Sequence, residues 1–430
     1  MKHQLTPITL KSGARGLLID IPGSTVVDME FTFLSGFDFV EPKKYEVAHS
    51  MEHMIFGAND YFKSSTAFSR ELGLNGAYHN AYTSSFLNGY VAEAPEFEWE
   101  RVMRIFWQGL TTPKFLRREF VTEQETINEE LHSKLENHGL TLDVAMVKSM
   151  GDDHLQDYRT RIKLLPNITP ADLKRHHELS HTAANLRFIV AGNLRGKKQP
   201  LTKLLERYTR DLPGKGERKK VAQAKLIQPL GPIKVRRAGA DKIYFDLKSA
   251  CYGELNEREL IALGLLSYIL TGAWDSRLFG KGRRKGLLYG IACHGGSAQG
   301  ASGLSISGTV VPSKSAKMFS FMSEELIKLK TYGIREAELK RAKQYAIGNF
   351  QISHQTPQTL VNWYSRYFIE DDYFDFDRRP AAISAITKKD VNDLIERFYG
   401  ERATWAVGVL GRQPAESAVQ IFEQGSQLWV

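Results

Sequence analysis

The sequence predicts an α+β chain built from two homologous domains, and three observations support this fold class. The chain has 430 residues, which is enough for two or three domains with separate cores. Its composition, with 42% hydrophobic and 25% charged residues, is typical of a folded protein and excludes a disordered or fibrous class. Strand patterns and helix starts in the first half of the chain also recur in the second half, which indicates an internal repeat.

The repeated elements can be followed in order along the chain. Apolar and polar residues alternate over 29–33 and again over 243–247, at an offset of 214 positions, and this period predicts one half-buried strand in each half. Later in each half a Thr-x-x-Asp motif predicts the start of an amphipathic helix, at 169–172 and at 387–390. An apolar strand is expected after each of these helices, over 186–191 and 404–409.

A linker is predicted between the two domains. Residues 212–220 contain Pro, Gly and five charged side chains without an apolar period, as linkers do. We therefore expect a first domain over 1–211, a linker over 212–225 and a second domain over 226–430.

Composition also restricts the class of protein and its location. The two cysteines, Cys251 and Cys293, cannot form a disulfide scaffold and are expected to be buried in a protein of a reducing, cytoplasmic compartment. The most apolar stretch, Leu260–Leu270, is too short to span a membrane, and Met1–Leu10 lacks the apolar core of an export signal. The net charge of +9 permits weak attraction to nucleic acid, but no other feature predicts a nucleic-acid or membrane partner.

The segment Val47–Phe56 carries the most chemical information. His49 and His53 are four residues apart and share one face of a helix, with Glu52 beside them. Two imidazoles one turn apart suit a tetrahedral zinc ion, and an adjacent carboxylate can take a proton from zinc-bound water. The order is H-x-x-E-H, the reverse of the commoner H-E-x-x-H. The structural alternative is a buried helix with two hydrogen-bonded core histidines.

A third zinc ligand is predicted on a helix over residues 116–131. Glu125 and Glu129 point away from the apolar face of this helix, whereas Glu123 and Glu130 lie on it. A carboxylate among core residues is costly unless it is paired or bound to metal. Glu130 is therefore the predicted ligand, and Glu123 is predicted to orient a ligand or hold the water. Alternatively, both carboxylates lie at the edge of the apolar face and reach solvent.

These residues resemble the signature of a known family. The motif His49-x-x-Glu52-His53, followed 77 residues later by Glu130, is similar to that of the pitrilysin, insulin-degrading-enzyme and mitochondrial-processing-peptidase family of zinc metallopeptidases, the inverzincins. The resemblance implies two α/β-sandwich domains with mostly antiparallel sheets covered by helices. It also implies a zinc endopeptidase that cleaves peptides or unfolded segments. One zinc ion per chain would be bound by His49, His53 and Glu130, with Glu52 as general base and Glu123 as an additional acidic residue of the catalytic site.

The resemblance extends to residues that would contact substrate. Asn80 and Ala81 match an edge strand on which an extended peptide adds as a further strand, although Asn80 alone is equally typical of a turn. In the second half, Tyr289 and either Arg283 or Arg284 match a substrate-contacting pair, and the spacing favours Arg283. An ordinary surface turn is the alternative for this pair.

The second half keeps the repeat but lacks the metal ligands. The positions that correspond to the H-x-x-E-H residues are Leu263, Leu266 and Ser267, and residues 344–348, which correspond to the region of Glu130, contain no carboxylate. Only the first domain is therefore predicted to bind metal. The adjacent His176 and His177 diverge on a helix, so we expect a solvated face rather than a second metal site.

The resemblance also bears on partners. Chains of this length resemble half of the longer four-domain members of the family, which implies a homodimer or a heterodimer with a homologous subunit. The alternative function is a non-catalytic or partner-dependent structural subunit of a peptidase complex. The intact set of His49, Glu52, His53 and Glu130 argues against that alternative.

Overall fold

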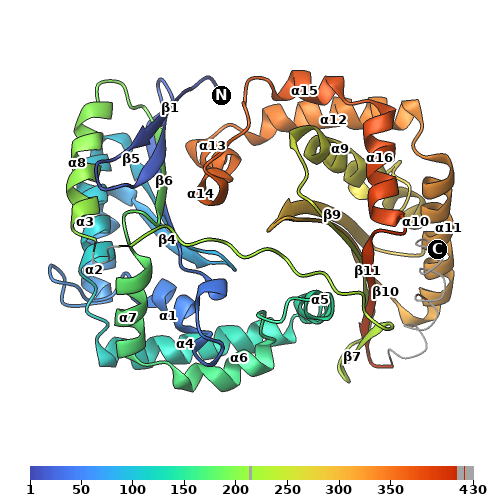
Figure 1. Cartoon of the computed structure of the whole chain (residues 1–430), viewed down its shortest axis with the longest axis horizontal. Coiled ribbons are helices and arrows are strands. Elements are labelled where there is room, and N and C mark those ends of the chain that lie inside the picture. The colour runs from blue at the N-terminus through green and yellow to red at the C-terminus, as the bar shows by residue number, and fades with distance from the viewer. Residues whose placement is uncertain (213–215, 414–420, 422–430) are drawn as a thin grey trace. The chain divides into compact units, whose positions relative to one another are not determined.

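The chain folds into two compact α+β units, each containing one mixed sheet with helices packed on it, as the sequence predicts (Figure 1). The computed structural model describes residues 1–212, 216–413 and 421. Residues 213–215 of the predicted linker lie outside the described residues. The first unit comprises Met1–His132, Tyr158–Val221 and Ile352–Phe374, and the second comprises Ser133–Asp157, Ala222–Gln351 and the chain from Asp375 onward.

The first unit is built on a six-stranded sheet in the order β1-β2-β6-β3-β5-β4. Neighbouring strands are antiparallel except for β2 and β6, which run parallel. Strand β4 therefore lies at one edge of the sheet, beside β5. The strands are β1 (Gln4–Thr9), β2 (Arg15–Asp20), β3 (Val26–Leu34), β4 (Tyr78–Thr83), β5 (Leu87–Pro95) and β6 (Leu186–Gly192).

Helices of the first unit form its core with the sheet. Phe31 of β3 packs against Trp107 of α3 with ring centroids 5.1 Å apart, and both side chains are fully buried. Helix α1 contacts α7 on one side and strands β4 and β5 on the other, which fixes its position near the sheet edge. The helices are α1 (Val47–Met54), α2 (Ser65–Leu72), α3 (Trp99–Thr111), α4 (Arg117–Glu136), α6 (Tyr158–Leu164), α7 (Pro170–Ser180), α8 (Lys198–Arg210), α13 (Pro357–Tyr364) and α14 (Tyr367–Glu370).

Strand β3 is buried on both faces, and the prediction of a half-buried strand is wrong for it. Met29, Phe31 and Phe33 are fully buried as predicted, but Asp28 and Thr32 on the opposite face are also inaccessible. The reason is that α13 and α14, from residues 357–370, pack on β3 and β6. A segment so distant in the sequence leaves no trace in the alternation of β3.

The second unit repeats this plan with five strands in the order β7-β11-β8-β10-β9. Here β7 and β11 are the parallel pair. Phe245 of β8 packs against Phe319 of α11 in the core, with ring centroids 5.6 Å apart. The elements are α5 (His138–Ser149), β7 (Ile233–Arg236), β8 (Ile243–Tyr252), α9 (Glu257–Ser267), α10 (Phe279–Arg284), β9 (Gly290–Ala298), β10 (Ala301–Val310), α11 (Ser315–Tyr332), α12 (Glu336–Ser353), α15 (Arg379–Ala385), α16 (Lys388–Tyr399) and β11 (Thr404–Gly411).

The two predicted helix starts are both capping boxes. The side chain of Thr169 accepts a hydrogen bond from the backbone N–H of Asp172 at the start of α7, and Thr387 does the same with Asp390 at the start of α16. In each case the aspartate carboxylate accepts the threonine backbone N–H in return. Reciprocal caps of this kind satisfy two N–H groups that a helix start leaves unpaired.

Each unit includes helices from the other half of the sequence. Helix α5 packs on β7, β8 and β11 of the second unit, while α13 and α14 complete the first. The predicted boundaries, 1–211, 212–225 and 226–430, follow the repeat along the chain and stay a prediction for its homologous halves. Within the predicted linker, Arg218 donates to the carbonyl oxygens of Phe368 and Ile369, which ties this part of it to the first unit. Among the described residues, none of the helices has the length and hydropathy of a membrane span.

Candidate metal centre

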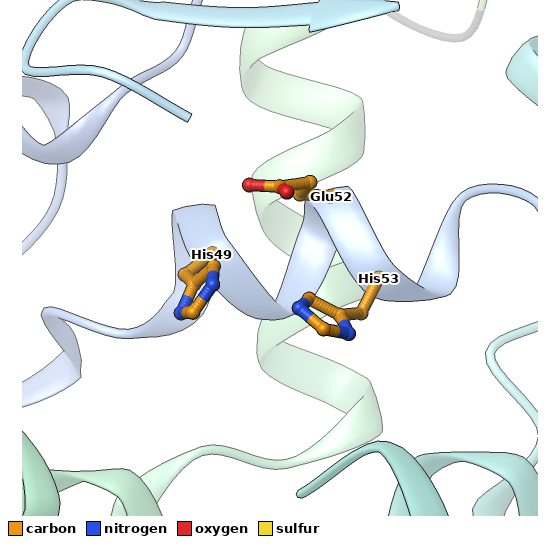
Figure 2. A group of neighbouring side chains, drawn as sticks. All are labelled: His49, Glu52 and His53. Carbon is orange, nitrogen blue, oxygen red and sulfur yellow. The ribbon is translucent and has the colours of Figure 1, made fainter. Parts of the chain in front are cut away.

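Helix α1 presents the two motif histidines in one direction. Met51 and Met54 are buried against the core and fix the rotation of the helix. Figure 2 shows the two imidazole rings projecting from α1 one turn apart, with the Glu52 carboxylate carried by the same helix. One ligand atom from each of His49, Glu52 and His53 lies within 4.8 Å of the others. In the part of the chain that the structure describes, this is the one group of three or more such side chains close enough to bind a metal ion.

Glu130 of α4 faces both imidazoles. Its Oε2 lies 3.5 Å from Nε2 of His49, and its Oε1 lies 3.6 Å from Nε2 of His53. Zinc–ligand distances of 2.0–2.1 Å in a tetrahedron place neighbouring ligand atoms about 3.4 Å apart. The spacing of these nitrogen and oxygen atoms therefore fits a single zinc ion, and the donor set of two imidazoles and one carboxylate is one that zinc uses in catalytic sites.

The other nitrogen of each ring is held by a carboxylate. Nδ1 of His49 lies 3.0 Å from Oε2 of Glu46, and Nδ1 of His53 lies 2.9 Å from Oε2 of Glu123. With Nδ1 as the donor, each Nε2 keeps its lone pair for a metal ion. Glu123 thus contacts the predicted ligand His53, and its role at a metal site stays a prediction. Glu46 is a contact that the sequence interpretation did not include.

The groups around His49 favour its positively charged, protonated imidazole although the side chain is buried. Burial acts to lower the pKa of His49, but hydrogen bonds to Glu130 and Glu46 outweigh it, so the pKa is raised above its ordinary value. Burial acts to raise the pKa of Glu46, but hydrogen bonds from His49 and Arg161 keep this pKa below its usual range. The carboxylates around His49 therefore stabilise a positive charge at this position, whether the imidazole proton carries it or a divalent cation that displaces that proton.

Glu52 is oriented by a chain of hydrogen bonds from β4 and β5. The hydroxyl of Thr83 donates to Oε2 of Glu52 at 2.6 Å. The amide of Asn88 donates to the Thr83 oxygen at 2.9 Å and to the carbonyl of Ala48 at 3.0 Å. The Ser35 hydroxyl donates to Oδ1 of Asn88 at 2.8 Å. These hydrogen bonds hold the Glu52 carboxylate in a fixed position beside the histidines.

The predicted substrate-contacting residues lie on both units. Asn80 and Ala81 are on β4, the edge strand of the first unit, and Oδ1 of Asn80 accepts the backbone N–H of Ala81. Arg283 and Tyr289 belong to the second unit, where the Arg283 guanidinium lies 4.8 Å from the centre of the Tyr289 ring. The choice of Arg283 over Arg284 and the substrate role of all four residues stay predictions.

The prediction that His176 and His177 lie on a solvated face is wrong. His176 and His177 are buried rather than solvated, and each Nε2 hydrogen-bonds a backbone carbonyl, that of Ser35 and of Leu110 respectively. Burial lowers the pKa of His176 to about 3 and that of His177 to about 4. The physical reason is tertiary packing: His176 is buried against the backbone at Ser35, and His177 against the end of α3 at Leu110 and the ring of Phe115. Cys251 and Cys293 are buried and free, as predicted.

Four residues that support the site were not identified from the sequence. Glu46 precedes His49 by one helical turn, and that i, i+3 spacing was a usable signal. Thr83 lies on the same strand as Asn80 and Ala81, but nothing in its pattern pointed to Glu52. Asn88 and Arg161 reach the site only through the tertiary fold, so the sequence held no signal for them.

Comparison with known proteins places the chain in a family. Residues 35–154, which include the centre, match the Insulinase (Peptidase family M16) family. Residues 167–345 match the Peptidase M16 inactive domain. The chain belongs to the peptidase M16 family. This confirms the resemblance inferred from the motif. The inactive-domain match over residues 167–345 includes Leu263, Leu266 and Ser267, the positions in the second half that lack the metal ligands.

The relatives of this M16 chain described next match at least 95% of its length. A Rickettsia bellii protein named "Uncharacterized zinc protease" is 22% identical over 417 residues, which cover 95% of this chain and 98% of that protein. A protease from Helicobacter pylori has a similar fold, with a TM-score of 0.83 and 18% identity over 95% of this chain and all of that one. The periplasmic protease PqqL from Escherichia coli matches 96% of this chain with 46% of its own, at a TM-score of 0.78 and 16% identity.

Proposed function

We propose that this M16 chain is a zinc-dependent endopeptidase that hydrolyses peptides or unfolded segments. One observation carries the proposal: Nε2 atoms of His49 and His53 face the Glu130 carboxylate at 3.5 and 3.6 Å, with Glu52 beside them. His49, His53 and Glu130 would hold one zinc ion. When bound there, zinc supplies Lewis acidity that polarises a carbonyl group and lowers the pKa of a coordinated water toward neutrality.

The residues of the chain carry out the proton transfers. Glu52 accepts a proton from the attacking water as the oxygen–carbon bond forms at the scissile carbonyl. The C–N bond then breaks as Glu52 returns the proton to the leaving amine nitrogen. The Thr83 hydroxyl holds the Glu52 carboxylate in place during both transfers. Glu123 fixes the orientation of His53 through Nδ1.

An extended peptide is the proposed substrate form. Strand β4 is an edge strand and carries Asn80 and Ala81, so an extended segment can add to it through backbone hydrogen bonds. Arg283 and Tyr289 are proposed as further substrate contacts from the second unit. The positively charged guanidinium of Arg283 lies over the ring of Tyr289, which is exposed.

A dimer and a cytoplasmic location are parts of the same proposal. The dimer, with an identical chain or a homologous subunit, is proposed from the family resemblance, and light scattering on a sizing column would distinguish twice 48.7 kDa from one chain. A reducing compartment is supported by the free cysteines, Cys251 and Cys293. The alternative function is a structural subunit that is inactive or needs a partner.

The proposal is tested by the conservative variant Glu52→Gln. We expect the purified wild type to contain one zinc ion per chain and to cleave a quenched-fluorescent peptide library until a chelator is added. Glu52→Gln should bind zinc like the wild type but lose turnover by at least about 100-fold, because the general base is removed. Undiminished cleavage by the zinc-loaded variant would refute the mechanism. Zinc binding without cleavage by the wild type would favour the structural-subunit alternative.

A further inference from the structure

The two histidines of the metal centre are held in different ways. The carboxylate of Glu123, which holds His53, is 31% exposed. The carboxylate of Glu46, which holds His49, is fully buried, and the His49 side chain is 4% exposed. A buried carboxylate is stable only if its charge is paired and its oxygens are hydrogen-bonded. The environment of Glu46 must therefore contain a compensating cation.

That cation is Arg161 of helix α6, which lies 115 residues after Glu46. Its Nε donates to Oε1 of Glu46 at 2.5 Å, and one terminal nitrogen donates to Oε2 at 3.0 Å. The pair is thus bidentate, the strongest geometry for an arginine and a carboxylate. Oε2 of Glu46 accepts from both Arg161 and His49.

Aromatic rings fix the guanidinium in turn. Its central carbon lies 4.6 Å from the ring centre of Phe37 and 5.5 Å from those of Tyr45 and Tyr158. A cation over aromatic faces is attracted electrostatically, more so when water is excluded. Arg161 is buried together with Glu46, so the ion pair is shielded from solvent.

We propose that Glu46, held by Arg161, is a positioning residue of the metal centre. It accepts the Nδ1–H of His49 and thereby fixes the ring with the Nε2 lone pair directed toward Glu130 and the metal. This inference rests on the proposed function, because it assigns a role toward the zinc ion. It goes beyond that function by naming an ion pair that sets zinc affinity without touching zinc.

The test compares paired substitutions in the full-length chain. Glu46→Leu with Arg161→Met removes the acceptor and both charges at similar volume, a type of exchange that buried ion pairs often tolerate. Glu46→Gln with Arg161→Met keeps a neutral acceptor for the histidine. The matched control is Glu338→Leu with Arg277→Met, because Arg277 donates to Glu338 at 2.9 and 2.7 Å in a buried bidentate pair of the second unit.

Zinc affinity is measured by competition with a chromophoric chelator, and the melting temperature of each metal-free variant is recorded alongside. We expect the leucine variant to bind zinc about 10–100-fold more weakly than the wild type, as for other groups that orient a metal-bound histidine. The glutamine variant should recover part of this loss. The control pair should leave zinc affinity unchanged at whatever melting temperature it shows.

The outcomes separate the two hypotheses. Wild-type zinc affinity in both Glu46 variants would overturn the positioning role while leaving the proposed function intact. An equal loss of affinity in the control pair would also overturn it, because the effect would then be general destabilisation. If the leucine variant does not fold, Glu46→Met with Arg161→Met takes its place, because methionine also lacks an oxygen acceptor for the histidine, and wild-type affinity in that variant would overturn the role. Failure of the wild type to bind zinc would overturn the proposed function and this inference together.

Discussion

Single side chains fix the geometry on which the proposed chemistry depends, and Thr83 is the clearest case. Its hydroxyl donates to Glu52 at 2.6 Å and accepts from Asn88 at 2.9 Å. Thr83→Val keeps the shape of the side chain but removes the hydroxyl, and a hydrogen bond to a charged group is worth about 1.5–3 kcal/mol. We expect kcat to fall by about tenfold or more, with KM and zinc affinity nearly unchanged, in steady-state peptide hydrolysis.

Thr122→Val provides the control for this prediction. Thr122 is exposed on α4 and donates only to the backbone carbonyl of Arg118. The substitution there should leave kcat unchanged. A wild-type kcat in Thr83→Val, or a loss of zinc from it, would show that Thr83 does not act through Glu52.

Asp28 makes the stability of the first unit depend on pH. Burial, together with the nearby charges of Glu30 and Glu93, raises the pKa of Asp28 to about 8. Its two oxygens have no hydrogen-bond partner in the described structure. In the unfolded chain the carboxyl ionises near its ordinary pKa of 3.8, whereas in the folded chain it keeps its proton until about pH 8. Folding stability therefore falls as the pH rises between these values and stays low above them.

Asp28→Asn should remove this cost. We expect its gain in unfolding free energy, measured in urea, to be about 2 kcal/mol or more larger at pH 8.5 than at pH 5. Asp172→Asn is the control, since hydrogen bonds from Lys44 and Thr169 outweigh burial and lower the pKa of Asp172. That variant should lose stability by the same amount at both pH values. A pH-independent effect of Asp28→Asn would contradict the assignment.

At the scale of the element, helix α4 separates its carboxylates by face. Glu130 and Glu123 contact the two histidines, whereas Glu129 is exposed. We expect Glu130→Gln to weaken zinc binding most, because it removes a charged ligand, and Glu123→Gln to weaken it by about tenfold as an orienting group. Glu129→Gln is the matched control and should bind zinc like the wild type. Equal affinities of the three variants in chelator competition would refute the facial assignment.

Short sequence patterns predicted the strands and helix starts that depend only on neighbouring residues. The alternation in β3 and β8 and the capping boxes of α7 and α16 involve residues within one turn or one strand, so the sequence shows them directly. The prediction that one face of β3 is exposed was wrong, because α13, more than 300 residues away in the sequence, covers that face. The prediction of a solvated face for His176 and His177 was wrong for a similar reason, since both are buried against residues far away in the sequence, Ser35 and Leu110.

The candidate site shows the same limit. His49, Glu52 and His53 share one helix, and the helical period predicted that they would lie close together, as they do. The same period selected Glu123 and Glu130 on α4, and both contact a histidine. The groups that hold these side chains reach them from other strands and helices. Periodicity carries no information about such contacts, so they could be found only in the folded chain.

At the scale of the molecule, neither compact unit is a continuous piece of chain. Helices α13 and α14 complete the first unit although they follow α12, and α5 completes the second although it follows α4. Residues 354–356 alone connect α12 to α13. Each sheet therefore has a face that is covered only when a helix from the other half of the sequence is in place. We expect this exchange to make the chain unfold as one cooperative unit despite its two cores.

Leucine-to-alanine substitutions in the exchanged helices test this expectation. Leu360 of α13 is 0% exposed and Leu142 of α5 is 2% exposed, so each truncation should cost about 2–5 kcal/mol. In scanning calorimetry of the metal-free chain we expect one transition, which both Leu360→Ala and Leu142→Ala lower. Added zinc should raise the same transition as a whole, because ligand binding to one part stabilises every part that unfolds with it. Two resolved transitions, each lowered by only one of the substitutions and with only one raised by zinc, would show that the units unfold independently.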